Sequence, residues 1–191
     1  MTGRPPGRIR IVAGTHRGRR LRVAAGTTVR PTSERVREAV FDALGPIGGL
    51  RVLDLFAGTG AMGLESLSRG AAECVFVEND LRVVSVLREN IAALDYEHVC
   101  RVIQSPYEKA AEGLAAAGRS FDLLFVDPPY RILTEVEVTL TPLLPALLGD
   151  GGIAVIEGGK VSHAALGLSP VFDRTYGDTR VTMIRMRRDT P

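Results

Sequence analysis

The sequence predicts an α/β fold built on a doubly wound, mostly parallel β-sheet. Between residues 51 and 157, apolar segments of strand length alternate with amphipathic segments of helix length, which is the pattern of a parallel sheet with helices on both faces. The chain has 191 residues, of which 45% are hydrophobic and 24% are charged, so one domain with a buried core is expected. We place this domain at residues 31–191, after a basic β-hairpin extension at residues 1–30.

The extension is set apart by its charge. Residues 1–33 carry eight arginines and no acid, a formal charge of +8, whereas the rest of the chain carries −6. Residues 8–13 and 20–24 are predicted to be short strands of a hairpin, whose arginines would project from a rigid surface. This charge favours a nucleic acid as partner over a solvated tail. The candidate contacts are Arg8, Arg10, Arg17, Arg19, Arg20 and Arg22.

The first helix is predicted at residues 31–44. Apolar residues recur there at helical spacing, with Thr32 or Ser33 as N-cap and Gly45-Pro46 as the stop signal. Three charged residues lie opposite the apolar stripe, where they form either a solvated face or a contact to RNA or cofactor: Arg35, Arg37 and Glu38.

The following elements alternate regularly, because apolar runs of five or six residues are separated by segments with helical periodicity. The predicted strands are residues 51–56, 73–78, 99–104, 121–126 and 152–157. The predicted helices are residues 61–69, 80–94, 107–117 and 134–148. Two last strands, at residues 171–176 and 180–187, flank Gly177-Asp178 and are predicted to close the fold as an antiparallel hairpin.

A glycine-rich loop follows the first strand of the sheet. Gly58, Gly60 and Gly63 have the spacing GxGxxG, and Glu78 ends the next strand 20 residues after Gly58. Glycines permit a close backbone approach to a cofactor, and the carboxylate accepts hydrogen bonds from ribose hydroxyls. The spacing alone fits NAD and other adenosine cofactors.

Asp54, at the end of the strand before this loop, favours one of these cofactors. A carboxylate here attracts the ammonium and sulfonium groups of S-adenosylmethionine (SAM) and repels a pyrophosphate. An NAD-dependent oxidoreductase remains an alternative, which thermal shifts with NAD and with S-adenosylhomocysteine would separate.

The most specific motif is Asp127-Pro128-Pro129-Tyr130, directly after a buried strand. Two prolines make the turn rigid and leave its carbonyls for other donors, and the turn falls at the carboxyl edge of the sheet, where ligands bind. Asp127 and the Pro128 carbonyl could accept the two hydrogens of an exocyclic amine, while Tyr130 stacks on the base. These contacts would aim the nitrogen lone pair at a methyl group in the adjoining cofactor site.

These motifs resemble the class I SAM-dependent methyltransferases that modify exocyclic amines, whose hallmark is (Asp/Asn/Ser)-Pro-Pro-(Tyr/Phe/Trp). More closely, the chain is similar to the RsmD family of small-subunit ribosomal RNA guanine-N2 methyltransferases. The segments that carry this resemblance are Arg8-Ile-Arg-Ile-Val-Ala-Gly14, Arg17-Gly18-Arg19, Arg30-Pro-Thr32, Arg35-Val-Arg37-Glu38, Asp54-Leu-Phe-Ala-Gly-Thr-Gly60 and Asp127-Pro-Pro-Tyr130.

The resemblance implies a Rossmann-like class I methyltransferase sheet and a set of site residues. It assigns Asp54, Gly58 and Gly60 to the methionine end of SAM, Glu78 to its ribose and Thr32 to a further cofactor contact. Ser105 stands where related enzymes often contact adenine with an acid, so this contact departs from the family pattern. The residues implied in catalysis are Asp127, Pro128, Pro129 and Tyr130.

The implied partner is small-subunit ribosomal RNA, either free or within an assembled or partly assembled subunit. Adenine-N6 or cytosine-N4 methylation of other RNA or DNA remains an alternative, as does a non-catalytic RNA-binding assembly factor. No membrane span or secretory signal is expected. The scattered histidines, Cys74 and Cys100 predict no metal site, and two isolated thiols fit a cytoplasmic protein.

Overall fold

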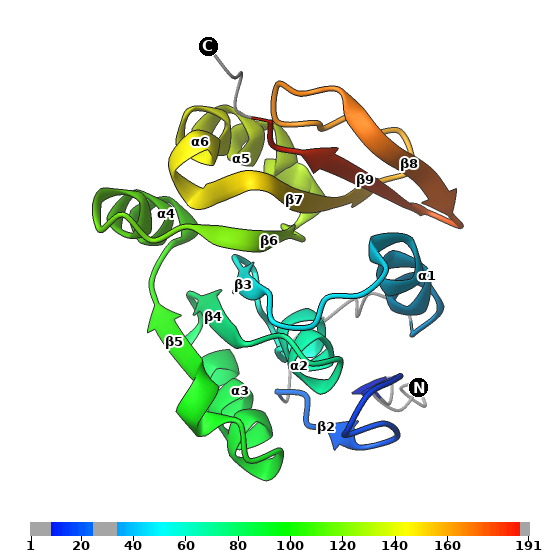
Figure 1. Cartoon of the computed structure of the whole chain (residues 1–191), viewed down its shortest axis with the longest axis vertical. Helices are drawn as coiled ribbons and strands as arrows, with labels where there is room; N and C mark the ends of the chain where they lie inside the picture. Colours follow the sequence, from blue (N-terminus) through cyan, green and yellow to red (C-terminus); the bar gives the residue numbers. More distant parts are fainter. Residues whose placement is uncertain (1–8, 25–33, 188–191) are drawn as a thin grey trace, which may run out of the picture.

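The computed structural model describes residues 9–24 and 34–187, and its centre is a seven-stranded sheet (Figure 1). The strands are β3 (Arg51–Asp54), β4 (Glu73–Glu78), β5 (Cys100–Gln104), β6 (Phe121–Val126), β7 (Leu148–Gly159), β8 (Pro170–Tyr176) and β9 (Thr179–Arg185). Their order across the sheet is β5-β4-β3-β6-β7-β9-β8. The first five of these are parallel, and β9 pairs antiparallel with both β7 and β8. The predicted doubly wound sheet with an antiparallel C-terminal hairpin is therefore confirmed.

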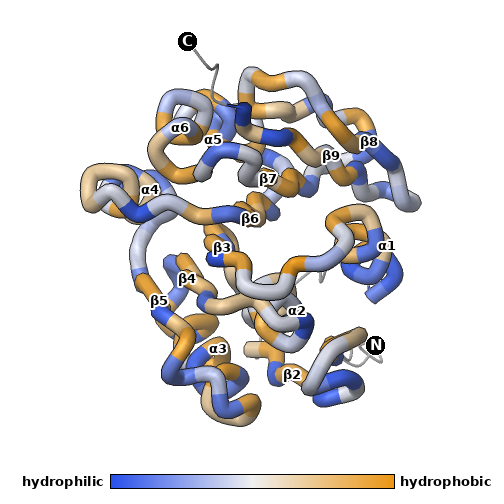
Figure 2. The backbone as a smooth tube through the Cα atoms, viewed as in Figure 1, coloured by the Kyte–Doolittle hydropathy of each residue, from blue (hydrophilic) through white to orange (hydrophobic). Residues whose placement is uncertain are grey.

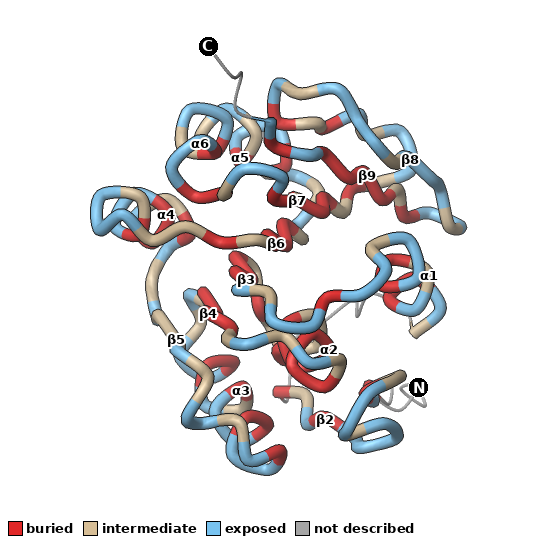
Figure 3. Tube along the Cα trace, in the orientation of Figure 1, coloured by how far each residue is buried: buried red, intermediate tan, exposed pale blue. Residues whose placement is uncertain are grey.

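Helices cover both faces of this sheet. They are α1 (Glu34–Leu44), α2 (Ala61–Ser68), α3 (Leu81–Ala93), α4 (Tyr107–Ala116), α5 (Leu133–Leu140) and α6 (Leu144–Leu147), with short 3-10 turns η1 (Glu97–Val99), η2 (Tyr130–Ile132) and η3 (Thr141–Leu143). Side chains alternate along a strand, so Val52 packs with α1, α2 and α3 while Leu53 packs with α4, α5 and α6. In Figure 3 the strands at the centre of the sheet are mostly buried, and Figure 2 shows apolar residues along the same strands.

The prediction of one continuous helix at residues 134–148 was wrong. The structure divides this segment into α5, η3 and α6, and the chain enters β7 at Leu148. Pro142 and Pro145 explain the breaks, because proline lacks the backbone N–H that an uninterrupted helix requires. The strand predicted at residues 152–157 is also longer, since β7 extends to Gly159.

The N-terminal hairpin is shorter than predicted and is built into the core. Only β1 (Ile9–Arg10) and β2 (Arg20–Leu21) pair, in place of strands at residues 8–13 and 20–24. The side chains of Ile9, Ile11 and Leu21 are buried in the same cluster as α1, α2 and α3. The two-residue ladder is therefore stabilised by this packing, since an isolated hairpin is marginal in water.

Two further expectations need correction. Arg37 does not lie opposite the apolar stripe of α1, because only 1% of this residue is exposed. Cys74 and Cys100 are distant in sequence but lie opposite each other on β4 and β5, so the two free thiols are not isolated in space. Burial raises the pKa of both thiols, which keeps them protonated at neutral pH.

Candidate cofactor and amine-binding site

The three glycines that follow β3, two in the loop and Gly63 in α2, have different structural roles. Gly58 and Gly60 adopt φ values of 53° and 83°, the left-handed region that glycine enters without strain. A Cβ at Gly60 would lie 2.5 Å from Leu87 Cδ1, and one at Gly63 would lie 2.3 Å from Phe76 Cε1, whereas at Gly58 it would meet no atom closer than 4.0 Å. Gly60 and Gly63 therefore let the loop pack on its neighbours, and Gly58 leaves space beside it.

Glu78 connects the end of β4 to this loop. Its carboxylate accepts hydrogen bonds from the backbone N–H of Gly58 (3.0 Å), Asn79 (2.7 Å) and Asp80 (2.9 Å). A carboxylate offers about four lone-pair positions, so Glu78 both fixes the glycine loop and retains capacity for a ligand hydroxyl.

Asp54 lies beneath the loop, with only 2% of its surface exposed. Its Oδ2 accepts a hydrogen bond from the Gly63 N–H at 3.2 Å. Burial raises the pKa of Asp54 to about 7, and the nearby charge of Glu78 acts in the same direction, against the hydrogen bond from Gly63. Its charge is therefore sensitive to any cation that approaches the loop.

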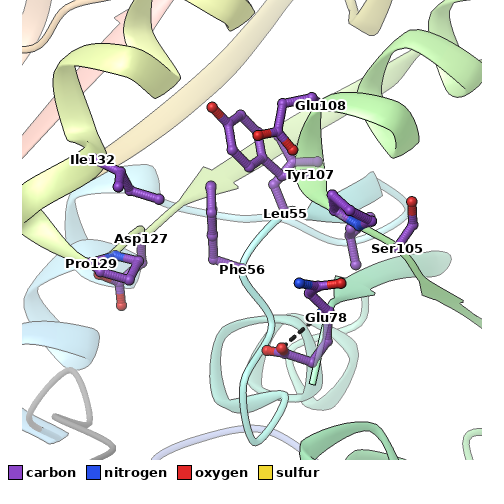
Figure 4. Close-up of a pocket in the computed structure, with 12 residues that line it drawn as sticks. Leu55, Phe56, Glu78, Ser105, Tyr107, Glu108, Asp127, Pro129 and Ile132 are labelled. Carbon is purple, nitrogen blue, oxygen red and sulfur yellow. Dashed lines mark hydrogen bonds between the residues drawn. The ribbon is translucent and has the colours of Figure 1, made fainter. Parts of the chain in front are cut away.

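A cavity of about 400 Å³ opens beside the loop at the carboxyl ends of β5, β4, β3 and β6 (Figure 4). It brings together four predicted site residues: Glu78, Ser105, Asp127 and Pro129. Its other walls include residues that sequence reasoning missed: Leu55, Phe56, Asn79, Tyr107, Glu108 and Ile132. Most of these residues directly follow a strand end or begin α4. They could have been predicted from their positions in the sequence, next to the predicted site residues Asp54, Glu78 and Ser105.

The remaining predicted residues do not line this cavity. Asp54, Gly58 and Gly60 lie in or under the loop, and Pro128 is buried. The Tyr130 hydroxyl lies 3.2 Å from the Thr179 hydroxyl, and a Cβ on Gly159 would lie 3.2 Å from the Tyr130 ring. The ring is thus held at the ends of β7 and β9. Thr32 and Arg8 lie outside the described residues.

The arginines of the N-terminal segment are exposed but not equivalent. Arg10 and Arg22 form ion pairs with Glu34 (2.9 Å) and Glu89 (2.6 Å), and Arg19 donates to the carbonyl of Ala93 at 2.9 Å. Within the part of the chain that the structure describes, no ion pair or hydrogen bond involves the side chains of Arg17 and Arg20, which leaves them available to a phosphate.

Two buried polar residues attach this arginine segment to the cofactor loop. Glu65 of α2, fully buried, accepts from the backbone N–H of Val12 (2.6 Å) and Ala13 (2.9 Å). Asn90 of α3 bonds both backbone groups of Arg22 and donates to the Thr59 carbonyl at 2.9 Å. Thr59 lies between Gly58 and Gly60. Asn90 therefore links the N-terminal arginine segment to the glycine loop.

Comparison with known proteins defines the family. A family model described as Conserved hypothetical protein 95 matches residues 9–185, nearly the whole chain. The chain belongs to this family, the RsmD family. Within the described residues, this RsmD-family protein has no helix long and apolar enough to cross a membrane.

Individual relatives agree with this membership. YlbH of Bacillus subtilis is 38% identical over 183 residues, which cover 94% of this chain and 100% of that protein. The ribosomal RNA small subunit methyltransferase D of Escherichia coli is 44% identical over 126 residues, 65% of this chain and 62% of that protein. A solved structure from Thermus thermophilus has a TM-score of 0.82 at 34% identity and covers 93% of this chain and 99% of that one.

The expected cofactor occurs, in its demethylated form, in proteins of this fold. An RNA methyltransferase of Salinibacter ruber, solved with S-adenosylhomocysteine, has a TM-score of 0.63 at 15% identity, covering 84% of this chain and 96% of that one. The RsmD-family cavity fits the parent cofactor SAM: Glu78 lines it with a carboxylate that could accept from a ribose hydroxyl, Gly58 leaves open space, and the rings of Phe56 and Tyr107, 5.0 Å apart, offer apolar surface. Among the described residues, no group of three or more His, Cys, Asp or Glu could hold a metal ion.

Proposed function

We propose that this chain transfers the methyl group of SAM to the exocyclic N2 amine of a guanine in small-subunit ribosomal RNA. The observation that supports this most is the shared cavity: Asp127 and Pro129 of the proline turn face the same space as Glu78 and Ser105. A donor and an acceptor bound there would lie side by side, which is what a direct transfer between two substrates requires.

Residues at the β3 and β4 ends of the cavity bind the cofactor. Glu78 accepts from the ribose hydroxyls, Phe56 packs on apolar surface, and the buried charge of Asp54 attracts the positive methionine end through the glycine loop. When bound, SAM supplies a methyl group on a positively charged sulfur, which leaves as the neutral thioether.

Residues at the β6 end orient the amine. Asp127 and the Pro128 carbonyl accept its two hydrogens, so its nitrogen lone pair points toward the methyl group. Prolines on either side of the Pro128 carbonyl make the arrangement rigid, and the Tyr130 ring supports the base. The amine nitrogen exchanges one of its protons for the methyl group and releases that proton to solvent, while Asp127 and the Pro128 carbonyl hold the amine in place.

The N-terminal segment binds the RNA. Arg17 and Arg20 contact phosphates, and Glu65 and Asn90 hold the segment at a fixed position relative to the cofactor loop. The target guanine is unpaired or leaves its stack to reach the cavity. The names of the E. coli relative and of others in this family support small-subunit ribosomal RNA as the substrate.

The experiment is methyl transfer from labelled SAM to unmodified small ribosomal subunits, to the same RNA stripped of protein, and to duplex DNA. Digestion then identifies the methylated nucleoside. We expect N2-methylguanine from a ribosomal substrate. Methyladenine or methylcytosine would contradict the substrate and retain the enzyme class, and no transfer to any substrate would contradict the proposal.

A further inference from the structure

One carboxylate near the proline turn has no part in the mechanism described above. Glu157 lies in β7, two residues before that strand ends at Gly159, and it is half-buried. The ladder between β6 and β7 pairs Val126 with Ile156, so Glu157 stands beside Asp127, the first residue after β6. The strand next to the residue that orients the amine therefore carries a second carboxylate at the carboxyl edge of the sheet.

Glu157 projects from the face of the sheet over which the Tyr130 ring lies. Directly opposed residues of an antiparallel pair project from the same face, and Glu157 is opposed to Val181, which is buried in the cluster that contains α1. Side chains alternate along a strand, so a Cβ on Gly159 would project from this face as well. That Cβ would lie 3.2 Å from the Tyr130 ring. A base stacked on this ring would therefore lie next to Glu157 and Asp127 together.

The edge of guanine that carries the N2 amine presents two neighbouring donors, the amine itself and the N1–H of the ring. In adenine and in cytosine, the ring nitrogen next to the exocyclic amine has a lone pair in place of this hydrogen. An ionised carboxylate only accepts hydrogen bonds, so it pairs with the N1–H of guanine and repels the lone pair of the other two bases. Enzymes that act on an extruded base read this edge in the same manner.

We propose that Glu157 accepts a hydrogen bond from the N1–H of the target guanine and thereby selects guanine over adenine and cytosine. This inference rests on the proposed function. Asp127 and the Pro128 carbonyl hold the amine, and Glu157 reads the ring nitrogen next to it from the neighbouring strand. Neighbouring strands lie about 4.8 Å apart, a distance that a glutamate side chain can span. A carboxylate offers about four lone-pair positions, so other contacts of Glu157 leave capacity for this one.

A structural role of Glu157 at the end of β7 would be a different explanation for its position. Such a role would change the rate of methyl transfer to every acceptor base by the same factor. Recognition of the N1–H changes the preference between acceptors that differ at this edge of the base. A ratio of two transfer rates, measured with the same enzyme, therefore distinguishes the two roles.

The test is single-turnover methyl transfer to two RNA substrates that differ at the target base, after the guanine that the wild-type chain methylates has been mapped. The first substrate keeps this guanine, and the second carries 2-aminopurine there, which retains the 2-amino group but has a lone pair at N1. We expect the wild-type chain to prefer guanine by about ten- to a hundredfold, the range for a hydrogen bond to a charged group. Glu157→Ala should lower this ratio by about tenfold or more, through slower transfer to guanine.

Glu157→Gln is the second variant and keeps the test open if the alanine variant fails to fold. Its amide can donate to the N1 lone pair of 2-aminopurine, so we expect faster transfer to that substrate than the wild-type chain shows. Glu112→Gln makes the same chemical change at an exposed position of α4 and retains the wild-type ratio.

A wild-type ratio near one, or an unchanged ratio in both Glu157 variants, overturns the assignment of Glu157. Absence of transfer from the wild-type chain to any guanine of ribosomal RNA is a different result, because it contradicts the proposed function itself. Melting curves and the affinity for S-adenosylhomocysteine identify a variant that has lost its fold or its cofactor site, which would lower both transfer rates together.

Discussion

The fold raises the pKa of Asp54, which makes the stability of the protein depend on pH. Its carboxyl group has an ordinary pKa of 3.8 and a folded pKa of about 7, raised first by burial. Between these pH values the folded chain binds more protons than the unfolded chain, so this group makes the protein more stable as the pH falls.

Asp54→Asn removes that dependence. We expect the free energy of unfolding of the wild-type chain, relative to that of Asp54→Asn, to rise as the pH decreases from 7 toward 4, by up to about 1.4 kcal/mol per pH unit. Urea denaturation at several pH values measures this difference. A difference that stays constant with pH, or that grows toward alkaline pH, contradicts a raised pKa.

The hydroxyl group of Thr179 contributes to the orientation of Tyr130. Thr179 is buried and its Oγ1 lies 3.2 Å from the Tyr130 hydroxyl. Thr179→Val removes this contact, and a hydrogen bond of about 0.5–1.5 kcal/mol corresponds to a loss of roughly two- to tenfold in kcat/KM for RNA. The affinity for S-adenosylhomocysteine stays unchanged and Thr179→Ser restores the rate. Wild-type kinetics in Thr179→Val would mean that the contact does not position the tyrosine.

At the scale of elements, α2 joins the arginine segment to the cofactor loop. Glu65 is fully buried and pairs with Arg69 (2.8 Å) and with the equally buried Arg37 (3.7 Å), besides the two N–H groups of the segment. The cluster ties β1 and β2 to the elements that carry the candidate site.

Glu65→Gln removes the buried negative charge that pairs with Arg37 and Arg69. We expect the free energy of unfolding to fall by about 3–5 kcal/mol, the range for breaking a buried ion pair. Glu89→Gln removes the partner of Arg22 at an exposed surface pair and should cost within about 0.5 kcal/mol. Similar losses in the two variants, measured by urea denaturation, would contradict the difference in burial on which this prediction depends.

These elements also show what the sequence could predict. Apolar periodicity located the strands of the parallel sheet, and the motifs at their carboxyl ends then had to meet at one edge, which placed Glu78, Ser105 and Asp127 at one cavity. The break after α5 was visible in Pro142 and Pro145, but helical periodicity outweighed it. Contacts of Glu65 with Val12 and of Asn90 with Arg22 span more than 50 residues, so no local pattern could reveal them.

At the scale of the whole molecule, charge separates the segment proposed to bind RNA from the mildly acidic remainder. Residues 1–33 carry +8 against −6 elsewhere, and Arg17 and Arg20 are exposed on the described part of this segment. Each phosphate contact contributes about one unit to the slope of log affinity against log salt.

Arg17→Ala with Arg20→Ala should therefore weaken RNA binding and reduce that slope by about two. Arg101→Ala with Arg119→Ala makes the same change in net charge near the amino ends of β5 and β6, away from the cavity, and should leave the slope intact. Fluorescence binding titrations at several salt concentrations measure both variants. Equal slopes in the two double variants would contradict a contact between the N-terminal segment and RNA phosphates.

Single-turnover methyl transfer with Asp127→Ala is the measurement that best tests whether Asp127 orients an amine beside a cofactor bound in the same cavity. We expect a rate about 10²–10³ lower, as for the loss of a preorganised hydrogen-bonding group, with unchanged affinity for S-adenosylhomocysteine. Asp122→Ala, on the strand that precedes Asp127 and paired with Arg51, should remain within a few-fold of wild type. A rate for Asp127→Ala that also stays within a few-fold of wild type would contradict this role of Asp127.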